Sequence, residues 1–159
     1  MMQEIMLLLM LLIANGSPLA ARALLGERLK DPIDAGLLLG GRPLFGPSKT
    51  WLGLVTAISA TALFAPVLGL DWWIGALIGS LAMLGDLVSS FVKRRRGHLS
   101  GARAIGLDHL PESLLPLLAC IPLLGITLWQ VILISLAYVL VNTLTDLVYA
   151  WVDPRIRLA

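Results

Sequence analysis

The sequence predicts an all-α integral membrane protein that forms a single domain over residues 1–159. Hydrophobic residues make up 58% of the chain and charged residues only 14%, whereas soluble domains contain roughly 45–50% apolar and about 25% charged residues. The apolar residues also gather in five runs, most of them near the roughly 20 residues that a helix needs to cross a bilayer. No internal repeat or linker divides the chain, so one domain is expected.

Five transmembrane helices are expected, at about 5–25, 51–70, 72–92, 114–128 and 131–152. We expect the first run to be a transmembrane helix rather than a secretory signal peptide, because Glu4 precedes it and no Lys or Arg does. We expect this first helix to be broken or unwound at Asn15-Gly16-Ser17-Pro18. The fourth run is short and contains Pro116 and Pro122, which predicts a kinked or tilted helix.

Basic residues are confined to alternate connections between the predicted helices. The first and third connections and the C-terminal segment carry eleven of the twelve Lys and Arg residues, whereas the connections near Asp71 and Trp129 carry none. The positive-inside rule then predicts a multi-pass protein of the cell (inner) membrane, with two functional loops in the cytoplasm and the N-terminus outside. Tryptophans at both predicted interfaces agree with this topology: Trp72, Trp73 and Trp129 outside, Trp51 and Trp151 inside.

A carboxylate lies inside the third predicted helix. Asp86 precedes Lys93 by seven residues, or roughly 10 Å of helix, and an acid at that depth costs about 2.5–3.5 kcal/mol on insertion scales. Asp86, Ser89, Ser90 and Lys93 are spaced i, i+3, i+4 and i+7, so they share one helix face. Because a buried acid usually faces a partner, a water-filled cavity or an ion, this face is a candidate site.

The first connection contains a loop whose backbone is shaped by its composition. Four glycines and two prolines lie between Gly36 and Pro47, and Gly46-Pro47-Ser48-Lys49-Thr50 directly precedes a predicted helix. Backbone N–H groups, hydroxyls and a lysine at such a position suit a phosphate group. The segment is not a Walker A motif, because Pro47-Ser48 stands where that motif has its lysine. The loop is expected at the same membrane face as Asp86, where phosphate-binding cations and carboxylates would converge.

Several other polar residues have two interpretations each. Asn142, Thr145, Asp146 and Tyr149 line one face of the last helix, and Asp146 either contributes to a site or pairs structurally with Arg22 or a neighbouring helix backbone. His98 and His109 are expected to be loop residues rather than ligands, because neither has a second His or Cys at metal spacing. The single Cys120 lacks a disulfide partner, so redox chemistry and thiolate metal sites are not expected.

Taken in order along the chain, these motifs resemble those of the CDP-archaeol synthases. The resemblance covers nearly the whole chain and rests on Asn15-Gly16-Ser17-Pro18, Pro32-Ile33-Asp34-Ala35-Gly36, Gly41-Arg42-Pro43-Leu44-Phe45-Gly46-Pro47-Ser48-Lys49-Thr50-Trp51, Gly53, Gly85-Asp86, Ser90, Lys93-Arg94-Arg95, Gly97 and Leu107-Asp108. The second half is also similar to the C-terminal region of phosphatidate cytidylyltransferases. One departure is the segment Asp108-His109-Leu110-Pro111-Glu112-Ser113. Here an Asp-Gln or Asp-Arg start is expected and, in the enzymes that make CDP-diacylglycerol, a second Asp, whose place Glu112 takes only with one extra residue.

The resemblance implies a membrane nucleotidyltransferase that transfers CMP from CTP to an archaeol-type or phosphatidate-like lipid phosphate, giving CDP-lipid and pyrophosphate with Mg²⁺. Its implied partners are CTP, the lipid phosphate and the bilayer, and no nucleic acid is expected. An ionised phosphate oxygen needs no side chain to activate it, so the barrier lies in bringing two polyanions together. The expected catalytic residues are Asp86, Asp108, Lys49 and Lys93, and the expected metal ligands are Asp86, Asp108 and Glu112. The expected substrate-binding residues are Arg42, Gly46, Ser48, Thr50, Ser90, Arg94, Arg95, Asn15 and Asp34.

Two other classes of function remain open from the residues alone. A non-catalytic scaffold would bind anionic lipid through Arg94, Arg95 and Arg96, but would need neither Asp86 nor the glycine-rich loop. A small ion or solute carrier would also bury acids, but should show inverted repeats and polar groups towards both faces. Mg²⁺-dependent CTP affinity separates the enzyme from both. Close packing of a neighbouring helix or of a second subunit, which would make a homodimer, is allowed at Gly75, Gly79 and Gly85.

Overall fold

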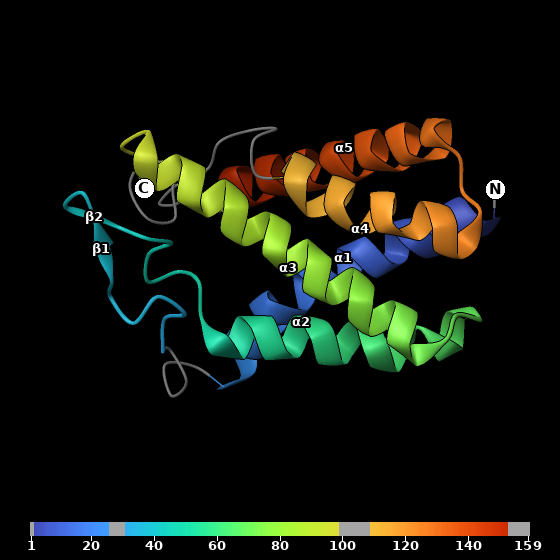
Figure 1. The fold of residues 1–159 in the computed structure, drawn as a ribbon, viewed down its shortest axis with the longest axis horizontal. Helices are drawn as coiled ribbons and strands as arrows, with labels where there is room; N and C mark the ends of the chain where they lie inside the picture. The colour runs from blue at the N-terminus through green and yellow to red at the C-terminus, as the bar shows by residue number, and fades with distance from the viewer. Residues whose placement is uncertain (1, 26–30, 99–108, 153–159) are drawn as a thin grey trace.

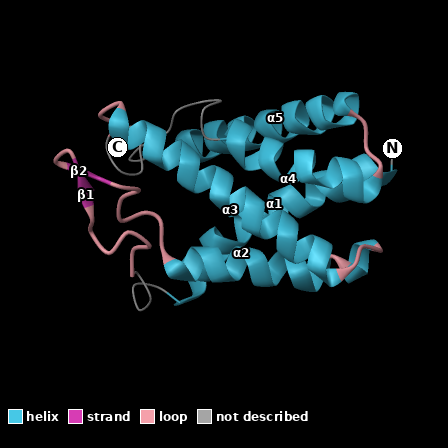
Figure 2. Ribbon diagram, viewed as in Figure 1, coloured by secondary structure: helices cyan, strands magenta, loops and turns pink. Residues whose placement is uncertain are grey.

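Among the residues that the structure describes, four helices are long and apolar enough to cross a membrane, and a fifth apolar helix is shorter. The computed structural model describes residues 2–25, 31–98 and 109–152. The long spans are Met2–Leu25, Trp51–Leu68, Trp72–Arg95 and Leu128–Val148. The all-α class predicted from the sequence is confirmed, and Figure 2 shows that helix makes up most of the described chain.

The elements follow one another as a helical bundle with one small hairpin (Figure 1). The helices are α1 (Met2–Leu25), α2 (Trp51–Phe64), α3 (Trp72–Arg95), α4 (His109–Leu124) and α5 (Leu128–Val152), with a short 3-10 helix, η2 (Pro66–Leu68), after α2. The strands β1 (Leu38–Leu39) and β2 (Arg42–Pro43) pair antiparallel, with Leu38 opposite Pro43 and Leu39 opposite Arg42. The hairpin extends beyond the bundle at the end where α3 finishes.

Helix α3 lies at the centre of the bundle, in contact with α1, α2 and α4. Three of its glycines make this close packing feasible, because a side-chain carbon at Gly75 or Gly79 would collide with Thr61 of α2, and one at Gly85 would collide with the main chain of Pro111. At these glycines, α3 therefore packs against other helices of the same chain. The homodimer suggested by their spacing stays a prediction.

The structure differs from the predictions most clearly in α1 and α4. Helix α1 continues without a break through Asn15-Gly16-Ser17-Pro18, because in an apolar environment every freed backbone group is costly and one proline removes a single helical hydrogen bond. Helix α4 begins at His109 rather than near residue 114 and ends at Leu124. Its 16 residues span only about 24 Å, which is less than the roughly 30 Å of hydrocarbon. It remains helical over Pro116 and Pro122, and the predicted kink stays a prediction.

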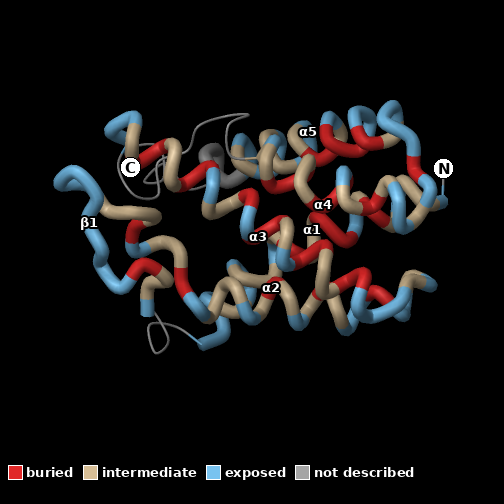
Figure 3. Tube along the Cα trace, viewed as in Figure 1, coloured by how far each residue is buried: buried red, intermediate tan, exposed pale blue. Residues whose placement is uncertain are grey.

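The apolar core occupies the part of the bundle farther from the hairpin (Figure 3). Its most buried side chains come from four helices: Leu7, Met10, Leu11, Ile78, Leu117, Cys120, Val131, Ile134 and Tyr138. Large apolar side chains such as Leu63, Leu136 and Leu140 are exposed on the outside of the bundle, as lipid-facing positions should be. Several buried side chains are polar or charged, among them Ser90, Lys93 and Arg94 in the last two turns of α3 and Glu112 in the first turn of α4.

Candidate functional site

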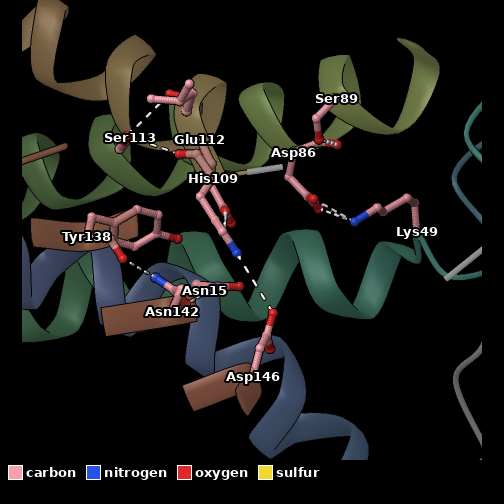
Figure 4. A network of polar contacts seen from close by, with 11 residues as sticks. Asn15, Lys49, Asp86, Ser89, His109, Glu112, Ser113, Tyr138, Asn142 and Asp146 are labelled. Atoms are coloured by element: carbon pink, nitrogen blue, oxygen red, sulfur yellow. Dashed lines mark hydrogen bonds and ion pairs between the residues drawn. The ribbon is translucent and has the colours of Figure 1, made fainter. Parts of the chain in front are cut away.

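The glycine-rich loop and α3 meet in an ion pair between Lys49 and Asp86 (Figure 4). The Nζ atom of Lys49 lies 2.6 Å from both Oδ1 and Oδ2 of Asp86, and about a fifth of each side chain is exposed. The two residues are 37 positions apart in the sequence. The convergence of the loop lysine on the intramembrane acid, predicted from the sequence, is thus found in the structure.

Asp34 organises the loop that carries Lys49. Its buried carboxylate accepts hydrogen bonds from the backbone N–H groups of Gly36 (3.1 Å), Phe45 (2.9 Å) and Gly46 (2.8 Å). Burial raises the pKa of Asp34, but the bonds from Gly46, Phe45 and Gly36 outweigh burial, so the pKa lies below its usual value. Gly46 has a φ of 96°, a conformation that suits glycine. The carboxylate therefore shapes the turn just before Lys49 and does not face the cavity described below.

The end of the loop is held by the start of α2. The Thr50 side chain caps this helix by accepting a hydrogen bond from the N–H of Gly53 at 3.2 Å. The carbonyl of Lys49 accepts from the N–H of Ile33 at 2.8 Å. Lys49 is thus fixed on both sides, by the cap after it and by the Asp34 turn before it.

Arg42 and Arg95 join the hairpin to the end of α3. Arg42 donates from Nη1 to the carbonyl of Arg95 at 2.7 Å. Arg95 donates in return to the carbonyls of Leu39, Arg42 (3.1 Å) and Pro43 (2.7 Å). Neither guanidinium lines the cavity. The structure therefore shows these two residues, which we expected to bind substrate, holding main-chain carbonyls. Their predicted contact with substrate stays a prediction.

A cavity of about 950 Å³ lies between α1, α3, α4, α5 and the loop. It gathers eight of the residues expected to act in catalysis, substrate binding or metal binding: Asn15, Ser48, Lys49, Asp86, Ser90, Lys93, Arg94 and Glu112. The predicted α3 face is therefore largely present, although the hydroxyl of Ser89 turns away to donate to the carbonyl of Asp86 at 2.9 Å. A smaller cavity of about 60 Å³ lies on the loop side, and Lys49 and Asp86 line both cavities.

Three helices bring further polar side chains to this cavity. His109 was expected in a loop, but it begins α4, with Nδ1 3.6 Å from Oε2 of Glu112 and Nε2 4.0 Å from Oδ2 of Asp146. On the α1 side, Asn15 donates to Oδ1 of Asn142 at 2.7 Å. Arg22, the alternative partner predicted for Asp146, donates to the carbonyl of Ser48 at 3.3 Å. Figure 4 shows this network joining α1, α4 and α5.

Tyr138 is a residue of this region that the sequence reasoning missed. Its ring is fully buried and lies edge-on to that of His109, with the centroids 6.0 Å apart, and its carbonyl accepts from Asn142 at 2.9 Å. Tyr138 precedes Asn142 by four residues and Asp146 by eight. Helical spacing along α5 was therefore a signal that could have found it.

The predicted metal ligands are brought together in part. Asp86 and Glu112 both line the cavity. They directly follow Gly85 and Pro111, which are in close contact, so the two acids lie on adjoining turns of α3 and α4. Mg²⁺ binds one or two protein carboxylates and completes its shell with water and phosphate oxygens, so this pair of acids fits that ion. Within residues 2–25, 31–98 and 109–152, no group of three or more His, Cys, Asp and Glu side chains is placed to hold a metal.

Some of the residues singled out from the sequence lie outside the part of the chain that the structure describes. Asp108, the third expected ligand, lies outside the described residues, as do the basic residues Arg28, Lys30, Arg103, Arg155 and Arg157. The same holds for the side chains of Tyr149 and Trp151.

The sequence of this chain is similar to those of proteins described as CDP-archaeol synthases. The family model described as CarS-like, CDP-archaeol synthase, matches residues 70–152. The CDP-archaeol synthase of Sulfurisphaera tokodaii is 42% identical over 105 residues, which cover 62% of this chain and 60% of that protein. That of Hyperthermus butylicus is 39% identical over 116 residues, which cover 69% of this chain and 66% of that protein. Each match thus spans less than two thirds of the relative's length.

A solved structure shares the fold over almost the whole chain. It is described as that of an intramembrane enzyme for archaeal membrane lipids biosynthesis, and it superposes with a TM-score of 0.76 at 32% sequence identity. The superposition covers 90% of this chain and 92% of that one.

Proposed function

Because this chain belongs to the CarS-like, CDP-archaeol synthase family, we propose that it transfers CMP from CTP to a lipid phosphate, releasing pyrophosphate and forming a CDP-lipid. The names of its relatives support this reaction. The observation that carries the proposal is the contact of Lys49 with Asp86 at the wall of a cavity that also holds Lys93 and Arg94. Cations and a carboxylate at one opening are what two phosphate-bearing substrates require.

The reaction needs charge neutralisation more than it needs a base. An oxygen of the lipid phosphate attacks the α-phosphorus of CTP, the bond from that phosphorus to the oxygen bridging to the β-phosphate breaks, and pyrophosphate leaves with the electron pair. Lys93 and Arg94 are more than nine-tenths buried, so their charges act through a medium of low dielectric constant and stabilise phosphate oxygens strongly. The side chain of Arg94 is held in place by its bond to the carbonyl of His98 at 2.6 Å.

Asp86 and Glu112 are the described residues that would hold Mg²⁺, with Asp108 as the further ligand that the family resemblance implies. When bound, Mg²⁺ supplies positive charge to the phosphate oxygens and to the leaving pyrophosphate. Lys49 contacts both oxygens of Asp86, and its flexible side chain is long enough to move its ammonium group between this carboxylate and a phosphate oxygen. Lys49 would then bind CTP and leave the carboxylate of Asp86 free to hold Mg²⁺.

The orientation of the protein is part of this proposal. Arg42, Arg95 and Arg96 lie at the hairpin end of the bundle, whereas Trp72 and Trp129 start helices at the other end. The positive-inside rule supports a cytoplasmic location for the hairpin end and for the cavity near it, with the N-terminus outside.

A turnover assay in liposomes tests the reaction. Labelled CTP and Mg²⁺ are supplied with a panel of lipid phosphates bearing ether or ester tails, for wild type, Asp86→Asn and Lys49→Ala. We expect CDP-lipid from wild type and a loss of about 100-fold or more in both variants, as for removal of one charge-stabilising group. Arg96→Ala removes a cation at the exposed end of α3, outside the cavity lining, and should keep activity. If folded wild type makes no CDP-lipid from any tail and binds CTP no better than the two variants, the scaffold or carrier alternatives replace the enzyme.

A further inference from the structure

The exposed part of the cavity lining belongs to α1 and α5. On α3 and α4 the lining side chains are buried or half-buried, with Ser90 1%, Lys93 7% and Glu112 4% exposed. The lining residues on the C-terminal half of α1 and on α5, by contrast, include six that are exposed: Gly16, Leu19, Ala20, Arg22, Ala23 and Thr145. Both helices are among the long apolar spans. The exposed lining residues on these two helices therefore face the bilayer.

Arg22 is one of these exposed lining residues. It is in the last turn of α1, seven residues, or about 10 Å, beyond Asn15, at the level where a helix leaves the hydrocarbon. It is exposed and lines the cavity beside Leu19, Ala20 and Ala23.

Most of the bonding capacity of Arg22 is unused. Among the described residues, its guanidinium makes one hydrogen bond, from Nη2 to the carbonyl of Ser48 at 3.3 Å, and no ion pair with a carboxylate. A guanidinium has five N–H donors, so the rest remain available for an anion. Lys49, deeper in the cavity, is instead engaged by Asp86.

We propose that Arg22 binds the phosphate of the lipid substrate where it enters between α1 and α5, while Lys49, Lys93 and Arg94 hold the triphosphate farther inside. This inference rests on the proposed function and extends it by assigning a separate cation to each polyanion. Arginine binds phosphate through two parallel N–H bonds and carries its charge at the headgroup level on an apolar stem. Ala20 and Ala23 leave room along α1 for the first carbons of the lipid, and the tails stay in the bilayer.

A purely structural role for Arg22 makes a different prediction. If the side chain only holds the carbonyl of Ser48, its loss would disturb the neighbouring Lys49 and weaken CTP binding. If it binds the lipid phosphate, its loss weakens lipid binding and leaves the affinity for CTP unchanged. Separate measurements of CTP binding and lipid phosphate binding therefore distinguish the two roles of Arg22.

The experiment measures the dissociation constants of CTP and of a short-chain lipid phosphate separately, with the KM of each in turnover, for full-length Arg22→Gln and Arg22→Lys. We expect Arg22→Gln to weaken lipid phosphate binding by about 10- to 100-fold, the range for a lost charge-assisted hydrogen bond. The CTP dissociation constant should stay within about twofold of wild type, which also shows that the variant is folded. Arg22→Lys should recover part of the loss, because it keeps the charge but not the two parallel bonds. Arg96→Gln is the matched control.

Lipid phosphate binding within about twofold of wild type in Arg22→Gln overturns the assignment, and so does a parallel loss of CTP affinity. Failure of the proposed function gives a different result, because wild type would then form no CDP-lipid at all. The binding measurements on Arg22→Gln would still show whether Arg22 contacts the lipid phosphate.

Discussion

Gly85 of α3 lies directly against the main-chain carbonyl of Pro111 in the first turn of α4, with no space between them for a side-chain carbon. The next residue on each helix is an acid that lines the cavity, Asp86 on α3 and Glu112 on α4. This close contact between the two helices therefore adjoins the two carboxylates that we expect to hold a metal.

Gly85→Ala should separate α3 from α4 and move Glu112 away from Asp86. Overpacking of this kind costs about 1–3 kcal/mol, so we expect a lower melting temperature together with a loss of turnover. Ser80→Ala, at an exposed position of the same helix, is the control and should change neither quantity. A variant that melts lower but turns over normally would show that the contact supports only the fold.

Glu112→Gln keeps the size of the side chain but removes its charge. If Glu112 binds Mg²⁺, the Mg²⁺ concentration for half-maximal turnover should rise about tenfold or more, since even indirect metal partners contribute 10- to 100-fold. The measurement is a Mg²⁺ titration of the initial rate at saturating CTP. An unchanged titration curve with a lower melting temperature would instead make Glu112 a structural partner of His109, whose Nδ1 lies 3.6 Å from the glutamate.

Asp34 should make the stability of the loop depend on acid pH. Its pKa is lower in the folded protein than the usual aspartate value of about 3.9, so its ionised form stabilises the fold above that value. This stabilisation is lost as the pH falls from about 4 through the folded-state pKa, because the folded protein must then take up the proton. We expect Asp34→Asn to melt lower than wild type at pH 6, and the difference to shrink towards pH 3. A constant difference across this range would contradict the assignment.

Arg95→Ala should release the hairpin from α3. Three main-chain carbonyls lose their donor, so we expect faster proteolysis near Gly40 and Gly41, at the tip of the hairpin. The CTP dissociation constant should change little if Arg95 only joins the hairpin to the helix, whereas a rise of tenfold or more would support the substrate contact that the sequence predicts. Limited proteolysis and CTP binding, compared with Arg96→Ala, measure both effects.

Local sequence patterns predicted much of this site because its central residues are near one another along the chain. Asp86, Ser90, Lys93 and Arg94 line one cavity, as expected from residues that repeat with the period of a helix. The break predicted in α1 was wrong for a local reason as well. Asn-Gly-Ser-Pro disfavours a helix in water, but a membrane span that gives up its backbone hydrogen bonds has no water to replace them.

The sequence by itself determined that this chain is a helical membrane protein, which family it resembles, and that Lys49 and Asp86 belong to one site. Composition, helical period and motif order are all properties that can be read along the chain. Only the tertiary structure decided that Arg42 and Arg95 bind the main chain, that His109 lies between Glu112 and Asp146, and that Arg22 lines the same cavity as Lys49 and Asp86. These contacts depend on how far each helix is rotated and how closely it packs against the next, and no local pattern encodes either quantity.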